Sequence, residues 1–231
     1  MIDWSRAVVD AAHVRAQKGG PMTGPSPVDR GKPGSKLHVL SDATGLPMAT
    51  GISAGNTADG DAMIPLVNAF PPVRSRRGPR RRKPAKLHGD KTYNSRERRR
   101  WLRDKGIRPR LARKDIESKQ RLGRHRWVIE RSMASFTGYR RLTLRYERRA
   151  DTFKAFLALA AALVCFKRLQ HAKRDTLLLS PVLAVRSGQA LCCGRRGVQR
   201  KSMAAVASAR VTWSVVLRNS RSNVLFATPT A

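Results

Sequence analysis

Residues 125–131 read His-Arg-Trp-Val-Ile-Glu-Arg, and the fold can be worked out from this stretch. Its apolar side chains continue at helical spacing, which predicts one buried face made of Ile129, Met133 and Phe136. Arg126 and Glu130 lie four residues apart and off that face, so they share another side of the same helix. We expect this helix to span about residues 123–136.

Two other acids end short apolar runs on the N-terminal side of Glu130. Asp90 ends the strand-like run Lys-Leu-His-Gly-Asp at residues 86–90, and Asp10 ends the run Ala-Val-Val-Asp at residues 7–10. Carboxylate oxygens are the ligands that hard divalent cations prefer. Three separated acids in a strongly basic chain therefore suggest a metal site that works on nucleic acid. For any one acid alone, a helix cap or a surface charge remains the alternative.

The positive charge of the chain is concentrated in its middle. The net charge of the 231 residues is +33, and residues 74–149 alone hold 29 basic and seven acidic residues. Residues 1–73 are balanced, with six of each. A field this dense implies a polyanionic partner whose affinity depends on salt, because binding releases counterions. A solvated basic face, as in a ribosomal or nucleoid protein, is the alternative.

Cysteine usage and hydropathy point to a cytoplasmic, nucleoid-associated protein. Cys165, Cys192 and Cys193 are too few and too badly spaced for a zinc site or a disulfide framework. The longest apolar run, residues 155–166, has 12 residues, whereas a membrane span needs about 18. A buried helix is the better expectation for it, and we expect no membrane partner.

The order of the predicted elements indicates an α/β domain over residues 1–169. Residues 17–35 are rich in glycine and proline and should form loop, and residues 74–85 form a basic linker. The expected strands are 4–10, 36–41, 46–52, 86–90 and 107–112, and the expected helices are 58–70, 95–105, 123–136 and 151–169. These elements predict a mixed five-stranded sheet flanked by helices. Residues 170–231 carry one acid and no clear period, so we expect a basic, irregular tail, either disordered or from a non-native reading frame.

Several short stretches occur in an order that has a known counterpart. They are Val-Asp-Ala-Ala-His-Val-Arg-Ala-Gln-Lys-Gly-Gly (9–20), Asp-Arg-Gly-Lys-Pro-Gly-Ser-Lys (29–36), Asp-Ala-Thr-Gly-Leu-Pro (42–47), Gly-Asn-Thr-Ala-Asp (55–59), Gly-Asp-Lys-Thr-Tyr-Asn-Ser (89–95), Arg-Trp-Val-Ile-Glu-Arg (126–131) and Tyr-Arg-Arg-Leu-Thr-Leu-Arg-Tyr-Glu (139–147). Together they resemble the catalytic domain of bacterial insertion-sequence transposases of the DDE type, in the group called insertion-sequence families four and five. The resemblance covers about residues 5–169 and implies an RNase H-like fold.

The resemblance assigns roles to particular residues. It implies that Asp10, Asp90 and Glu130 are a catalytic triad that holds two Mg²⁺ or Mn²⁺ ions. Arg126 matches the arginine of the family's Tyr–Arg–Glu–Lys pattern and would contact a DNA phosphate, although an ion pair with Glu130 is an equal alternative. Gly123 and Thr137 stand where that pattern has its tyrosine and lysine. The predicted DNA-binding residues are Arg126, Lys91, Tyr93, Arg96, Arg99, Arg100 and Arg103. A solvated loop is the alternative for Lys91 and Tyr93, and a solvated helix face is the alternative for the arginines of residues 96–103. For Trp127 we expect packing rather than stacking on a base.

The implied function is DNA transposition. It consists of metal-dependent strand cleavage followed by transfer of a 3′-hydroxyl to target DNA. The expected partner is double-stranded DNA, at the element ends and at the target, bound by a homo-oligomer. No nucleotide cofactor is expected, because the exchange of phosphodiester bonds is nearly isoenergetic. A catalytically inactive DNA-binding remnant is the alternative. Only nine residues precede Asp10, where relatives usually carry an end-recognition region, so we expect a truncated copy.

Overall fold

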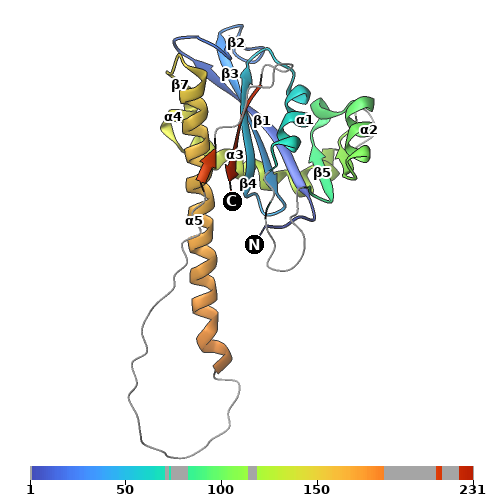
Figure 1. Ribbon diagram of the computed structural model, residues 1–231, viewed down its shortest axis with the longest axis vertical. Coiled ribbons are helices and arrows are strands. Elements are labelled where there is room, and N and C mark those ends of the chain that lie inside the picture. The colour runs from blue at the N-terminus through green and yellow to red at the C-terminus, as the bar shows by residue number, and fades with distance from the viewer. Residues whose placement is uncertain are drawn as a thin grey trace, which may run out of the picture. The chain divides into compact units, whose positions relative to one another are not determined.

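The computed structural model describes residues 2–70, 73, 83–113, 119–184, 212–214 and 224–230; within the last three segments, side chains are described for residues 127–171 (Figure 1). Residues 74–82 of the expected linker lie outside the described residues. The chain divides into one unit of Met1–Cys165 with Val211–Ala231 and a second of Phe166–Arg210. All residues predicted for the site belong to the first unit.

A mixed sheet forms the centre of the first unit, in the order β6-β5-β1-β3-β4-β9-β8. The central strand β1 (Ala7–Ala16) is antiparallel to β3 (Pro33–Asp42), which in turn is antiparallel to β4 (Pro47–Ala54). On its other side β1 is parallel to β5 (Lys86–Gly89), and β5 is parallel to β6 (Arg108–Leu111). These five strands confirm the predicted mixed sheet, and their arrangement is consistent with an RNase H-like fold.

Each face of the sheet is covered by its own set of helices. Alternate residues of a strand point to opposite sides, so the two faces contribute to two separate apolar cores. Along β1, Ala7 and Val9 pack into one apolar core, and Val8 and Val14 pack into the other. The first core is completed by the helices η1 (Asp59–Ala62), α1 (Met63–Asn68), η2 (Lys91–Tyr93) and α2 (Arg96–Asp104). The second is completed by α3 (Lys119–Thr137), α4 (Arg140–Thr143) and α5 (Ala150–Ala184).

The bounds of α2 show how local sequence sets an element. The Ser95 side chain accepts a hydrogen bond from the Arg98 amide at 3.1 Å, which caps the helix at the residue where the sequence predicted its start. Such a cap is worth about 1 kcal/mol. Gly106, with a φ of +71°, follows the end of the helix, where a residue with a β-carbon would be strained.

Some elements differ from the expectation. Within the predicted loop 17–35, β2 (Gly24–Pro25) pairs with β3. Farther along the chain, β7 (Leu144–Arg145) pairs with β1. Both strands are too short to show an alternation of apolar and polar residues. Within the predicted tail, α5 continues to Ala184, and β8 (Thr212–Ser214) and β9 (Val224–Thr230) are strands. Strand β9 pairs with β4, whose edge would otherwise present unpaired backbone groups.

The apolar run in α5 is buried on one side only. Leu157, Ala160 and Ala161 lie in the second core, whereas Leu159 and Leu163 are exposed. The run was predicted to form a buried helix; this is correct for the face that meets the sheet, and a sheet can cover only one side of a helix. Within the described part of the chain, no helix combines the length and the apolar character that crossing a membrane requires.

Candidate active site

Asp10 and Asp90 reach the same level on neighbouring parallel strands. In the pairing of β1 with β5, Ala7 is opposite Leu87 and Val8 is opposite His88. Asp10 and Asp90 each come three residues after the first of these pairs. The Asp90 backbone is still extended, with φ −71° and ψ 176°, although β5 ends at Gly89. Continued at this register, the two residues come to one level of the sheet, although 79 residues lie between them in the chain.

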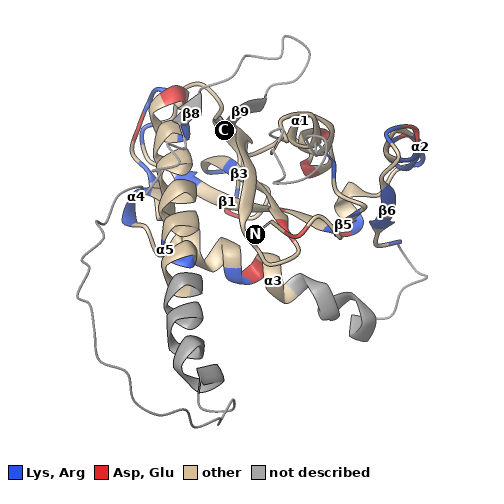
Figure 2. Cartoon of the chain, turned by 60° about the horizontal axis from the view of Figure 1, so that its bottom comes forward, with Lys and Arg blue, Asp and Glu red and all other residues tan. Residues whose placement is uncertain are grey.

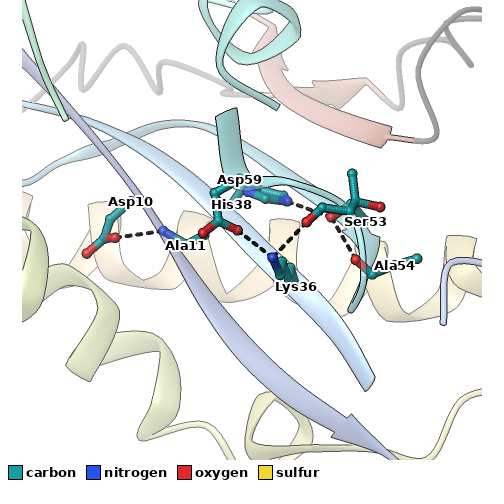
Figure 3. Close-up of polar contacts among 8 residues, drawn as sticks. Asp10, Ala11, Lys36, His38, Ser53, Ala54 and Asp59 are labelled. Atoms are coloured by element: carbon teal, nitrogen blue, oxygen red, sulfur yellow. Dashed lines mark hydrogen bonds and ion pairs between the residues drawn. The ribbon is translucent and has the colours of Figure 1, made fainter. Parts of the chain in front are cut away.

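The aspartate pair lies in a closely packed part of the sheet. Both aspartates are half-buried, and Asp10 Oδ1 accepts a hydrogen bond from the Ala11 amide at 2.9 Å (Figure 3). Gly89 precedes Asp90, and a β-carbon there would lie 3.0 Å from both Leu111 Cδ2 and Val9 Cγ1. A larger residue would push these neighbours away. Glycine therefore keeps β5 close to the strands on either side of it.

Glu130 comes from α3, on the sheet face that Asp10 shares. Ile129, Met133 and Phe136 are buried in the same core as Val8 and Val14, as their helical spacing predicted. Asp10 lies between those two valines in the alternation of β1. Glu130 itself is exposed.

Two side-chain bonds fix the position of α3 along the sheet. Ser132 Oγ donates to the Gly45 carbonyl at 2.7 Å, and Arg131 donates to the Thr44 carbonyl at 2.8 Å. Both carbonyls belong to the turn between β3 and β4. The turn of a hairpin thereby sets where the helix that carries Glu130 docks.

The donor chemistry of the aspartate pair suits a divalent cation. Carboxylate oxygens are hard ligands, and two of them at one level can share an ion. Among the described side chains, no group of three histidines, cysteines or acids is gathered closely enough to hold a metal ion. The structure thus brings Asp10 and Asp90 together and supplies Glu130 on a separate element of the same face. The three-residue site remains a prediction.

Tyr93 does not have the exposed position that a DNA contact requires. Its side chain is 1% exposed, because η2 turns it into the first core, where Leu102 and Leu111 also lie. Burial raises the pKa of the Tyr93 phenol well above its ordinary value, and the charges of Asp10, Asp59 and Asp90 raise it further. The hydroxyl has no hydrogen-bond partner among the described residues. Tyr93 is therefore removed from the predicted DNA-binding set.

A buried polar cluster lies on the first-core face of the sheet, between β3, β4 and η1 (Figure 3). Lys36 Nζ lies 2.8 Å from Asp59 Oδ1 and donates to the Thr57 carbonyl at 2.7 Å. His38 Nε2 lies 2.7 Å from Ser53 Oγ. Burial lowers the pKa of His38 to about 4, against the opposing effect of the Asp59 charge. The cluster ties the Gly-Asn-Thr-Ala-Asp stretch to the sheet, a role for Asp59 that the sequence did not reveal.

The predicted DNA-binding arginines of α2 do not all have the same environment. Arg96, Arg100 and Arg103 are exposed, and α2 carries a concentration of basic residues (Figure 2). Arg99 is half-buried; its Nε donates to Asn94 Oδ1 at 2.6 Å, and its Nη2 donates to the Leu111 carbonyl. Arg99 therefore braces α2 against β6, and its contact with DNA stays a prediction.

The three remaining positions near the triad differ in what the structure describes. Lys91 is half-buried and directly follows Asp90. The side chain of Arg126 lies outside the described residues, so neither its phosphate contact nor its ion pair with Glu130 is tested. Trp127 was expected to pack, and that expectation is wrong: it is 53% exposed, and the Arg131 guanidinium lies 4.9 Å from its ring centroid.

The last matched stretch, residues 139–147, has a structural role centred on Arg145. This side chain is fully buried over the Phe153 ring. It donates to the Ser35 hydroxyl and to the carbonyls of Pro21, Met22, Glu147 and Arg148. Burial lowers its pKa, which the charge of Glu147 opposes. Arg145 thereby joins the loop before β2 to β3 and to the start of α5.

Comparison with known proteins decides the family. The sequence profile of the family described as "Transposase DDE domain" matches residues 5–165. The chain belongs to this family. Over 157 residues it is 44% identical to the "Putative transposase for insertion sequence element IS402" of Burkholderia cepacia, a match that covers 68% of this chain and 74% of that protein. The resemblance seen in the sequence is confirmed: this is an insertion-sequence DDE transposase.

Family membership gives the function at a coarse level. The function is DNA transposition, and the domain is of a transposase or nuclease type of enzyme that acts on DNA. Such DDE domains generally use divalent metal ions. The residues that would hold those ions, and the steps they would support, belong to the proposal below.

Proposed function

We propose that this transposase cleaves a DNA strand and transfers the resulting 3′-hydroxyl to target DNA, with Asp10, Asp90 and Glu130 as its catalytic carboxylates. The observation that carries the proposal is the common level of Asp10 and Asp90 on adjacent parallel strands. Two acids at one level of a sheet, with a third acid on the helix that covers the same face, fit a site for two Mg²⁺ or Mn²⁺ ions.

Each step of the chemistry exchanges one P–O bond for another. In the first step a water oxygen bonds to the scissile phosphorus and the 3′-oxygen leaves, which produces a 3′-hydroxyl and a 5′-phosphate. In the second step that hydroxyl attacks a target phosphodiester and displaces its 3′-oxygen. One bond forms and one breaks each time, so no nucleotide cofactor is consumed. When bound, a pair of divalent ions supplies charge stabilisation to the attacking and leaving oxygens.

The protein contributes position and charge. The sheet fixes Asp10 relative to Asp90, and α3 brings Glu130 to the same face. We infer that Arg126, Lys91 and the exposed arginines of α2 hold phosphates of double-stranded DNA, at the element ends and at the target. Such contacts make binding strong, steeply salt-dependent and weakly sequence-specific. Because transposition must join two element ends, we expect two or more copies to assemble on DNA.

Strand cleavage in Mg²⁺ or Mn²⁺ tests the proposal directly. Asp10→Asn, Asp90→Asn and Glu130→Gln should each lower the cleavage rate by about a hundredfold or more, the loss typical when transition-state stabilisation is removed. Asp104→Asn removes an exposed acid at the end of α2 and serves as the matched control. DNA affinity measured for each variant separates loss of chemistry from loss of folding. Wild-type cleavage by Asp90→Asn would refute the assignment.

A further inference from the structure

A basic pocket lies at the sheet end where β1 and β5 begin. Its volume is about 370 Å³, and its lining residues are Ser5, Arg6, Lys86, His88 and Arg110. Of the described residues that line it, none is acidic. Three permanent cations and an imidazole around one small cavity form an arrangement that attracts an anion.

The strand register places this pocket on the same sheet face as Asp10. Val8 pairs with His88, and His88 pairs with Arg110 on β6, so these three side chains point to one side. That side is the face of the core which α3 covers, since Val8 belongs to it. Asp10 comes two residues after Val8, and Arg6 comes two residues before it. Alternation therefore puts all of them on one face.

The pocket residues on β5 lie two to four positions before Asp90 along the strand: His88 is two before it, and Lys86 is four before it. At about 3.3 Å per residue this is roughly 7–13 Å. A duplex rises by about 3.4 Å per nucleotide of one strand, so this separation corresponds to about two to four nucleotides along the duplex axis. One DNA strand can therefore reach both places.

We propose that the basic pocket binds one backbone phosphate of the same DNA strand whose scissile phosphate is held at Asp10 and Asp90. This inference rests on the proposed function and adds a second fixed point for the substrate. The guanidinium groups of Arg6 and Arg110 can donate in pairs to phosphate oxygens, and the Lys86 ammonium and the Ser5 hydroxyl add single donors. A strand held at two points cannot slide along the sheet, so the pocket sets which phosphate reaches the carboxylates.

The salt dependence of DNA binding can count the phosphates involved. Affinity for a short duplex is measured across salt concentrations in EDTA, where no cleavage occurs, for Lys86→Ala, Arg110→Ala and the double variant. Each phosphate contact contributes about 0.9 to the slope of log affinity against log salt. If both cations hold one phosphate, the double variant should lose about 0.9; two independent surface contacts would lose about 1.8.

Arg108→Ala is the matched control. Arg108 is exposed on β6 and pairs with Lys86, so it shares the strand and the face without lining the pocket. The double variant Lys86→Ala with Arg108→Ala should show additive losses, in contrast to Lys86→Ala with Arg110→Ala. The proposal would be overturned if the slope losses are additive in both double variants, or if removing Lys86 and Arg110 leaves the slope unchanged. Thermal unfolding of each variant confirms that it is folded.

The pocket and the catalytic proposal can fail separately. Binding in EDTA does not require the carboxylates, so the same series made in an Asp90→Asn background should give the same slopes. A pocket that behaves as one phosphate site in a protein without cleavage activity would refute the catalytic proposal alone. If the protein cleaves DNA but the slope losses of Lys86→Ala and Arg110→Ala are additive, the pocket proposal alone is refuted.

Discussion

Asp10 and Asp90 occupy one level of two parallel strands, so the backbone hydrogen bonds between β1 and β5 set the separation of their carboxylates. Asp90 is the residue directly after β5, so its position follows from the end of that strand. Substitutions at the two positions test the properties of the pair.

A change of ligand softness at this pair should change the metal that supports cleavage. Thiolates bind Mg²⁺ poorly and accept softer transition metals more readily. We expect Asp90→Cys to lose cleavage in Mg²⁺ and to recover part of it in Mn²⁺, whereas Asp90→Ala should recover none. Equal activity of the two variants in Mn²⁺ would show that residue 90 does not ligate an ion.

The buried histidine beside η1 should make the protein less stable in acid. The pKa of His38 is about 4 in the folded protein, against an ordinary value of 6.5. Between these pH values the unfolded chain binds a proton that the folded chain does not. The contribution of neutral His38 to the free energy of unfolding is therefore fully present above pH 6.5. It falls as the pH drops toward 4, by about 3 kcal/mol in total.

Urea unfolding from pH 7 to pH 4.5 measures this effect. His38→Gln can keep a hydrogen bond to Ser53 but does not titrate, so its free energy of unfolding should depend less on pH than that of the wild type. His171→Gln, which changes an exposed histidine on α5, should keep the wild-type dependence. A parallel pH profile for His38→Gln would contradict the prediction.

Arg145 should be among the most sensitive positions for stability. Arg145→Met leaves buried carbonyls and a hydroxyl without their donor, and we expect a cost of about 3–5 kcal/mol. Arg145→Lys keeps the charge but lacks the planar set of donors, so it should rescue only part of the loss. The exposed Arg149→Met should change the free energy of unfolding by about 0.5 kcal/mol or less. A full rescue by lysine would mean that charge, not donor geometry, is what matters.

Tyr93 should contribute through its ring and not through its hydroxyl. Because the hydroxyl is buried without a described partner, Tyr93→Phe should leave stability unchanged or raise it by about 1 kcal/mol. Tyr93→Ala removes the packed ring and should cost about 3–5 kcal/mol. Denaturant titrations compare the two. A loss of more than about 1 kcal/mol in Tyr93→Phe would show that the hydroxyl has a partner in solution.

Much of the frame of the site could be predicted from local patterns. The run that ends at Asp90 is β5 with the extended residue after it, and Ile129, Met133 and Phe136 are the buried stripe of a helix. The strand expected at 4–10 exists but begins at Ala7 and continues past Asp10 to Ala16. These features depend on periodicity within a few residues, which a sequence displays directly.

What escaped prediction depends on contacts between distant segments. Tyr93 and Arg99 follow Asp90 in a basic stretch and resemble surface residues in sequence, yet the packing of η2 and α2 buries or engages them. Trp127 has a large apolar side chain of the kind found in protein cores, but it lies on the uncovered side of α3. The two residues of β7 carry no period at all, and only their pairing with β1 defines them.

The contacts of Ser132 and Arg131 with the hairpin turn give the three acids unequal rigidity. Asp10 and Asp90 are joined through the backbone of the sheet, whereas Glu130 is held by side-chain bonds that a bound duplex can compete with or reinforce. Under the proposed function, Glu130 is therefore the carboxylate whose position relative to the other two depends on how α3 docks on the sheet.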